Sequence, residues 1–338
     1  MEPKPLCFRP VYKSYLWGGK CLPACYGRAD APEVCAESWE ISGHTEGMSV
    51  VDGGAYAGET LDALAKRFGA QLMGRPFEKF PLIFKLINAR ERLSVQVHPS
   101  DASAKKWGGE AKSEMWYMLN DGQLYAGMRD DTTKPGFRAA LATRVAIHWL
   151  KKQNINHPVV DAISDAEKQE HHDAATRAAE KFLIRHDVHA GDALYIPGGL
   201  IHAIDAGCLV YEVQQCSNTT YRLYDWERNR KLHIDEGLRV VDWRLAPSIV
   251  RAGETAAGWR DVIQCDYFNL RELALESATT VAMAGSFHAL FVKNGTVRVE
   301  AGGAAIKAGC GASVLLPACC GAYTLAPEGR AEILVTTL

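Results

Sequence analysis

Residues 92–99 read Arg-Leu-Ser-Val-Gln-Val-His-Pro, an alternation of polar and apolar side chains. Successive side chains of a strand point to opposite faces, so this stretch would have one apolar and one polar face. The polar face presents a hydroxyl, an amide and an imidazole, those of Ser94, Gln96 and His98. Neighbours on that face lie roughly 6–7 Å apart, close enough to hold a cation and an oxyanion side by side. Pro99 cannot donate to a ladder and ends the strand. An edge strand with a polar outer face explains these residues equally well.

The bulk properties of the chain are those of a globular protein without a strong charge bias. Its 338 residues exceed what one small core requires and predict two domains, or one domain with an elaborated insert. A hydrophobic content of 47% and a net charge of −2 argue against nucleic acid or an anionic membrane as the main partner. Neither a signal peptide nor an apolar run of about 20 residues is visible. We therefore expect a cytoplasmic protein.

The chain has ten cysteines, which include the close pair Cys21 and Cys25 and the adjacent pair Cys319 and Cys320. Neither pair is matched by a second pair at zinc-ribbon spacing. With no secretion signal, we expect all ten to be reduced thiols, most of them buried as small apolar groups.

Two charged residues occur in apolar stretches near the start of the chain. Residues 80–87 form a nearly continuous apolar run, typical of a strand covered on both faces, and Lys85 lies in its middle. This lysine either extends to the surface or is kept inside to meet an anion. Glu37 shares the less polar face of the alternating stretch 36–42 and is either a rim carboxylate or a pocket residue.

The remaining pattern predicts a β protein with a helical insert. Between residues 130 and 186 the sequence pattern changes from that of strands to that of helices, with a Ser-Asp-Ala-Glu capping box at 164–167. This change predicts helices inserted between strands of the first domain. From about residue 246 the chain consists of short strands and Gly-rich turns. We therefore expect a first domain over residues 1–245 and a second β domain over residues 246–338.

The segment 191–202 has the spacing G-x5-P-x-G-x2-H and ends at His202. It resembles the second motif of the cupin superfamily, whose histidine is a metal ligand. A faded copy over 311–322 keeps Gly311 and Pro317 at the same spacing, but Cys319 replaces the second glycine and Ala322 the histidine. The fold class that this resemblance implies is mainly β with a helical insert, built from two cupin-type barrels (double-stranded β-helix or jelly roll), with the metal site kept only in the first. His98, Glu114 and His202 would supply two imidazoles and a carboxylate, and Gln96 a fourth ligand.

Several motifs, in the right order and with the right gaps, resemble the type I mannose-6-phosphate isomerase family in its shorter bacterial form. They are Trp-Gly-Gly at 17–19, Glu-Ser-Trp-Glu-Ile-Ser at 37–42, residues 80–87, residues 93–99, Lys-Ser-Glu at 112–114 and residues 202–222. The resemblance implies one zinc ion per chain on Gln96, His98, Glu114 and His202. It also implies Ser94 and Lys112 on the phosphate side, Lys85, Glu212 and Arg222 in the active site, and Glu37 in the pocket. Asn218 stands where many relatives carry Asp.

The activity implied by the resemblance is the interconversion of mannose 6-phosphate and fructose 6-phosphate through a cis-enediolate, with the metal as Lewis acid. Glu212, Lys112 and a metal-bound hydroxide are the candidates for the base, and Arg222 would contact either the phosphate or the enediolate. The alternatives are a cupin that binds a sugar phosphate without converting it and a metal oxygenase. We expect a monomer, with a dimer as the alternative, and a small-molecule sugar phosphate as partner.

Overall fold

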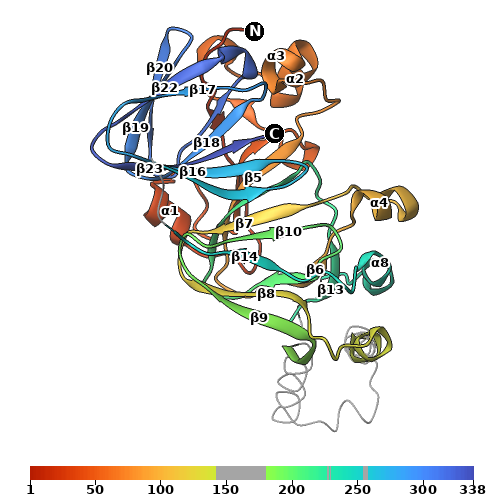
Figure 1. The fold of residues 1–338 in the computed structure, drawn as a ribbon. Helices are drawn as coiled ribbons and strands as arrows, with labels where there is room; N and C mark the ends of the chain where they lie inside the picture. The colour runs from red at the N-terminus through yellow and green to blue at the C-terminus, as the bar shows by residue number, and fades with distance from the viewer. Residues whose placement is uncertain (142–179, 227, 229, 254–257) are drawn as a thin grey trace.

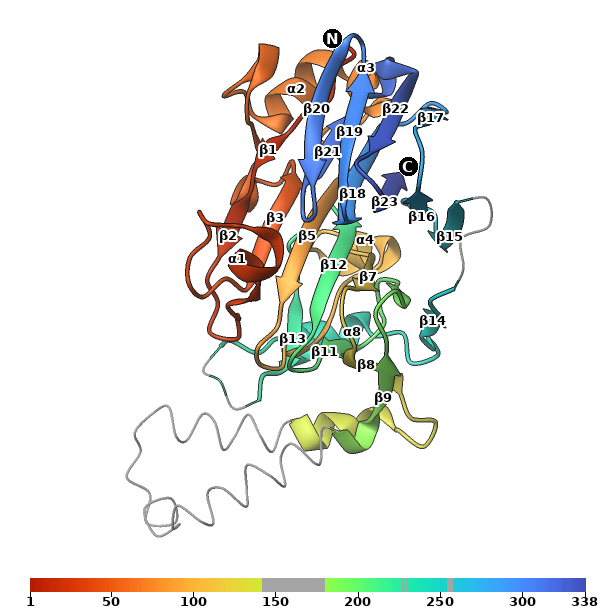
Figure 2. The ribbon, with the colours of Figure 1, turned by 90° about the vertical axis from the view of Figure 1, so that its left-hand side faces the viewer.

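The computed structural model describes residues 1–141, 180–226, 228, 230–253 and 258–338 (Figure 1). Within these residues, most of the regular structure is strand. The C-terminal strands gather at one end of the molecule, and the strands around β8 and β9 lie at the other end (Figures 1 and 2). The prediction of a mainly β protein is therefore confirmed.

The first barrel is built from a seven-stranded and a five-stranded sheet. The first has the order β14-β10-β7-β12-β5-β3-β2 and the second the order β13-β6-β11-β8-β9. The strands of the first sheet are β2 (Val11–Lys13), β3 (Glu37–Ser42), β5 (Leu82–Asn88), β7 (Glu114–Met118), β10 (Ala193–Ile196), β12 (Leu209–Gln215) and β14 (Ser248–Val250). Those of the second are β6 (Val95–Val97), β8 (Gly122–Met128), β9 (Leu183–Val188), β11 (His202–Ile204) and β13 (Tyr221–Tyr224).

The stretch 92–99 becomes a short internal strand. Its regular part, β6, is confined to Val95–Val97 and lies between β13 and β11. The edge-strand interpretation is therefore wrong. Gln96 is paired with His202 on one neighbour and with Arg222 on the other. This register brings together residues that are more than 100 positions apart in the chain.

The apolar run 80–87 forms β5, and all seven of its residues are buried, as its composition predicts. The strand lies between β3 and β12 in the middle of the seven-stranded sheet. Lys85 is only 3% exposed, so it is kept inside and does not reach the surface. It is paired with Trp39 on β3 and with Glu212 on β12.

The second barrel also consists of two sheets, with the orders β15-β16-β23-β18-β21 and β17-β22-β19-β20. Leu273, Val299, Val314, Leu325 and Ile333 belong to the hydrophobic cluster that it encloses. Its strands are β15 (Trp259–Gln264), β16 (Asn269–Leu275), β17 (Thr279–Ala282), β18 (His288–Asn294), β19 (Thr296–Ala301), β20 (Ala304–Gly309), β21 (Ser313–Leu316), β22 (Ala322–Pro327) and β23 (Ala331–Thr337).

The N-terminal segment connects the two barrels. Leu6 forms a β-bridge with Leu315 of β21, and β1 (Phe8–Arg9) pairs with β4 (Val50–Val51). One continuous hydrophobic cluster includes residues of both barrels, such as Phe84 and Phe291. The helices described along their whole length are α1 (Cys21–Tyr26), α2 (Leu61–Phe68), α3 (Ala70–Met73), α4 (Asp101–Trp107) and α8 (Ile234–Val240), with 3-10 turns η1 (Thr45–Gly47), η2 (Gly54–Tyr56) and η3 (Ala318–Cys320).

The expected division at residue 246 stays a prediction, and the topology favours a slightly later boundary. β14 still pairs with β10 of the first barrel, whereas β15 pairs with β16 of the second. Most of the expected insert, residues 142–179, lies outside the described residues; residues 134–141 and 180–182, at its two ends, are helical.

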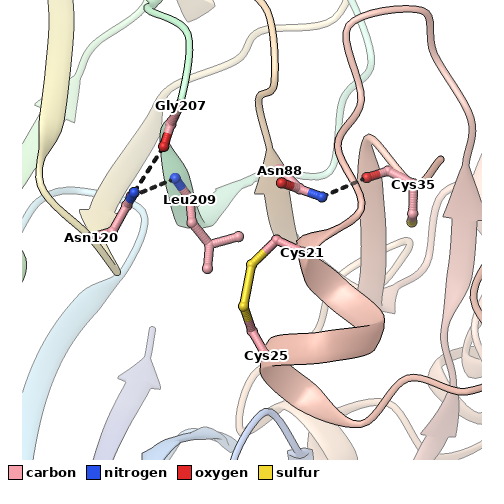
Figure 3. Close-up of a disulfide and its surroundings, with 7 residues drawn as sticks. All are labelled: Cys21, Cys25, Cys35, Asn88, Asn120, Gly207 and Leu209. Atoms are coloured by element: carbon pink, nitrogen blue, oxygen red, sulfur yellow. Dashed lines mark hydrogen bonds between the residues drawn. A yellow bond between two sulfur atoms is a disulfide. The ribbon is translucent and has the colours of Figure 1, made fainter. Parts of the chain in front are cut away.

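The expectation that all ten cysteines are reduced is wrong, because Cys21 and Cys25 form a disulfide (Figure 3). They lie four residues apart on α1, where side chains at this spacing share a face. Their Cα atoms are 5.6 Å apart, within the range that a disulfide requires. The other eight cysteines are free thiols.

Candidate functional site

Three side chains with metal-binding atoms meet inside the first barrel. His98 follows β6, Glu114 begins β7 and His202 begins β11. The two carboxylate oxygens of Glu114 lie 3.4 Å from His98 Nε2 and 3.3 Å from His202 Nε2. All three side chains are at most 1% exposed, and their ligating atoms lie within 4.8 Å of one another. The convergence that the sequence predicts is therefore present.

The hydrogen bonds of the two imidazoles determine which nitrogen carries a proton. His98 Nδ1 is 2.9 Å from the carbonyl oxygen of Thr219, and His202 Nδ1 is 2.8 Å from that of Leu200. A carbonyl oxygen only accepts, so each Nδ1 is the donor. Burial, with Lys112 nearby, lowers the pKa of His98 to about 3, and burial also lowers the pKa of His202, so both rings are neutral. Each Nε2 therefore presents a lone pair.

Both lone pairs face the Glu114 carboxylate, and neither the imidazole nitrogens nor the carboxylate carries a proton that could form a hydrogen bond between them. His98 Nε2 and Glu114 Oε1 are buried and have no hydrogen-bond partner among the described residues. Unpaired buried acceptors cost free energy unless something compensates them. A cation compensates all of them at once, and two imidazole nitrogens with one carboxylate suit zinc. The residues present therefore fit a metal ion.

Gln96 lies beside the same cluster. Its amide nitrogen is 3.3 Å from His202 Nε2, and its oxygen accepts a 3.3 Å hydrogen bond from Ser94. Turning the amide over exchanges the positions of its oxygen and nitrogen, which would direct the oxygen to the cluster. Gln96 as a fourth metal ligand stays a prediction, now supported by proximity.

Lys112 lies at the metal end of the site. Its Nζ is 2.7 Å from Glu114 Oε2, and the side chain is 5% exposed. Burial alone would raise the pKa of Glu114, but Lys112 and His98 outweigh it and hold that pKa well below its ordinary value. The metal-facing carboxylate is therefore ionised and ready to bind a cation.

A second buried cluster of charges lies on the seven-stranded sheet. Lys85 Nζ is 3.4 Å from Glu212 Oε1 and 3.7 Å from Glu37 Oε2. Burial alone would lower the pKa of Lys85, but the two carboxylates hold it above its ordinary value. Glu212 also accepts a 2.9 Å hydrogen bond from the Trp116 indole. Burial, with repulsion from Glu114, raises the pKa of Glu212.

A cavity of about 310 Å³ lies between the two sheets of the first barrel. Every residue predicted to bind substrate or act in catalysis lines it, together with Gln96. These residues are Glu37, Lys85, Ser94, Lys112, Glu212, Asn218 and Arg222. The structure thus brings all of them together, and their individual roles stay predictions.

Comparison with known proteins gives this cavity a context. Residues 6–152 match the family description "Phosphomannose isomerase type I, catalytic domain", and residues 260–338 match "Mannose-6-phosphate isomerase, cupin domain". The mannose-6-phosphate isomerase ManA of Bacillus subtilis is 31% identical, with 100% of both chains covered. The mannose-6-phosphate isomerase of Streptococcus mutans is 31% identical over 70% of this chain and 68% of that one.

The chain belongs to the type I phosphomannose isomerase family. The crystal structure of the mannose 6-phosphate isomerase from Bacillus subtilis superimposes with a TM-score of 0.79 at 26% identity, covering 99% of both chains. The enzyme from Salmonella typhimurium, solved with fructose 6-phosphate and zinc, shares the fold with a TM-score of 0.74 at 17% identity, covering 99% of this chain and 100% of that one. The two cupin-type barrels are therefore those of a phosphomannose isomerase.

Arg230 and His233 are among the cavity residues of this family member that sequence reasoning missed. Both line the cavity, and they lie in or beside the charged run 227–231, which resembles an ordinary solvated loop. The sequence feature that could have pointed to Arg230 is Asp225, an acidic residue that directly follows the apolar end of a strand.

In the described part of this phosphomannose isomerase chain, His98, Glu114 and His202 form the one cluster of histidine, cysteine and acidic side chains suited to a metal ion. No described helix combines the length and the hydropathy needed to cross a membrane.

Proposed function

We propose that this chain interconverts mannose 6-phosphate and fructose 6-phosphate as a zinc-dependent aldose–ketose isomerase. The observation that supports it most is the set of proton-free ligand atoms on His98, Glu114 and His202 beside a cavity rich in charged groups. Both named relatives given above at 31% identity are mannose-6-phosphate isomerases.

His98, Glu114 and His202, with Gln96 as fourth ligand, would hold one zinc ion, which supplies Lewis-acid polarisation of the sugar's carbonyl oxygen. Lys112 keeps Glu114 ionised for this purpose. Thr219 and Leu200 hold the two imidazoles in the required tautomer through their carbonyl groups.

The isomerisation of the open-chain sugar removes a proton from C2 and delivers one to C1, so a base must take up and return it. Glu212 lines the cavity, and its Oε1 is buried without a hydrogen-bond partner among the described residues. Trp116 fixes the other oxygen. Lys112 is already in contact with the carboxylate of Glu114, 2.7 Å away. We assign the base to Glu212: its carboxylate takes the C2 proton, and the electrons form the enediolate. A proton moves from the C2 hydroxyl to the C1 oxygen, and the carboxylic acid returns its proton to C1.

Arg222 would stabilise negative charge on the substrate, because it lines the same cavity from β13, next to Gln96 of β6. Lys85 would act through Glu212 and Glu37, whose carboxylates it holds in place.

A coupled assay for fructose 6-phosphate formed from mannose 6-phosphate by the zinc-loaded protein tests this function. Turnover supports the isomerase. Binding of mannose 6-phosphate without turnover would indicate the non-catalytic cupin, and oxygen consumption would indicate an oxygenase. A monomeric state and a cytoplasmic location stay predictions; light scattering of the purified protein tests the first.

A further inference from the structure

The cationic side chains that line the cavity differ in whether a carboxylate already neutralises them. Lys112 is neutralised by Glu114, and Lys85 lies between Glu37 and Glu212. These lysines therefore already have anionic partners within the protein. Arg222 and Arg230 also line the cavity.

Around Arg222 and Arg230 the guanidinium groups outnumber the carboxylates. Asp225 is 1% exposed in its side chain and is shared by Arg228 and Arg230. Arg222 has no carboxylate within 4 Å among the described residues, and its Nε is buried without a hydrogen-bond partner there. Burial and the repulsion of Arg230 lower the pKa of Arg222. An anion bound in the cavity beside these two arginines would relieve that repulsion.

The loop that carries Arg230 is closed tightly onto β13. His233 donates its backbone N–H to the Arg222 carbonyl at 2.7 Å, and Arg222 donates its own N–H to His233 Nδ1 at 3.3 Å. The Arg222 side chain also donates to the Lys231 carbonyl at 3.0 Å. The two arginines are therefore fixed relative to each other by the backbone.

Arg230 is oriented by Asp225 through a two-point contact. Its Nε donates to Oδ2 at 2.8 Å and its Nη2 to Oδ1 at 2.5 Å. A guanidinium has five N–H donors in a planar arrangement. The contact with Asp225 uses one edge and leaves the Nη1 side for a ligand in the cavity. The side chain is 32% exposed, so a ligand can reach it.

We propose that Arg230, oriented by Asp225, binds the phosphate of the substrate together with Arg222. This inference depends on the proposed isomerase function. Lys85 and Lys112 already have carboxylate partners, whereas Arg222 has none among the described residues and Arg230 keeps its Nη1 side free. The planar N–H donors of a guanidinium suit a phosphate. Arg230 is then a substrate-specificity residue.

The zinc-loaded protein and its Arg230→Gln variant are compared with glucitol 6-phosphate, which has the phosphate but no carbonyl, and with inorganic phosphate. We expect the inhibition constants of both to rise about 10-fold or more in Arg230→Gln, because a hydrogen bond to a charged group is lost. The KM for mannose 6-phosphate rises similarly while kcat stays near that of the parent. Binding of glucitol, which lacks the phosphate, does not change.

Arg228→Gln is the matched control. It breaks the other ion pair of the same Asp225, but Arg228 does not line the cavity. Unchanged phosphate affinity in this variant, with weakened affinity in Arg230→Gln, supports direct contact. Equal losses in both variants, or none in Arg230→Gln, overturn the proposal. Should Arg230→Gln unfold, Arg230→Lys keeps the charge without the two-point geometry; an inhibition constant unchanged in Arg230→Lys then overturns the proposal, and a severalfold rise supports it.

Calorimetric binding of the same two ligands separates this proposal from the function on which it depends. A protein that binds phosphate through Arg230 yet forms no fructose 6-phosphate would contradict the isomerase and leave the phosphate site standing. An active isomerase that is insensitive to Arg230→Gln would contradict the phosphate site alone.

Discussion

Lys112 lies 2.7 Å from Glu114, and the carboxylate that it contacts is the one that faces both imidazoles of the candidate metal centre. The ammonium group therefore stands next to the position of the cation. Two positive charges so close together repel each other unless the carboxylate lies between them. The ion pair thus connects the metal site with the rest of the cavity, and its loss should affect both.

Replacing Lys112 with Ala is expected to lower kcat about 10-fold or more with a smaller change in KM. The physical reason is that Lys112 acts at the reacting end, through Glu114 and the carbonyl of the sugar. Steady-state kinetics of the zinc-loaded variant measure the two parameters separately. If the substitution raises KM alone, the result would instead indicate that Lys112 and Ser94 bind the phosphate, as the family resemblance implies.

Replacing His98 with Ala is expected to reduce turnover at least about 100-fold, because Lewis-acid stabilisation by a metal is worth several kcal/mol. Bound zinc, measured by elemental analysis, should fall in parallel. His189, which is exposed on the surface, provides the control: His189→Ala should keep both zinc and activity. Normal turnover in His98→Ala would exclude this residue as a ligand.

The pH dependence should report Glu212. Burial and repulsion from Glu114 raise its pKa above the ordinary value of 4.5. Because the base acts as a carboxylate, kcat/KM should be lost as the pH falls through this raised pKa, so the acid limb lies above pH 4.5. Glu212→Gln should lower kcat by roughly 10²–10⁴-fold and abolish this limb, whereas Glu276→Gln, at an exposed position, should leave the profile unchanged. An unaltered acid limb in Glu212→Gln would assign the base elsewhere.

Thiol counting tests the Cys21–Cys25 disulfide. The unfolded, unreduced protein should react with eight equivalents of an alkylating reagent, and two more should react after reduction. Mass spectrometry of the peptide that spans α1 identifies the pair. Ten reactive thiols without reduction would restore the expectation that every cysteine is reduced.

Two of the candidate metal ligands could be predicted from the sequence because local patterns contain them. The cupin-like spacing ends at His202, and the alternating stretch includes His98; neither pattern requires knowledge of the tertiary structure. Lys85 could be flagged because a charge in an apolar run needs a partner, but only the register of β5 and β12 identifies Glu212 as that partner.

The missed features depend on contacts that a linear pattern does not contain. Arg230 lies in a charged run, and only the buried Asp225 distinguishes it from a solvated arginine. The Cys21–Cys25 disulfide requires a helical turn between the two cysteines. The sequence does not indicate a helix there, because Pro23 lies in the middle of this segment. The shared core of the two barrels depends on Leu6 bridging to Leu315, more than 300 residues away.

We propose that one zinc ion, held by His98, Glu114, His202 and Gln96, makes this chain an isomerase. To test this, the protein is stripped with a chelator, zinc is returned in steps, and fructose 6-phosphate formation from mannose 6-phosphate is followed. We expect no turnover at zero zinc and a linear rise that stops at one zinc per chain. Full turnover by the metal-free protein would contradict it.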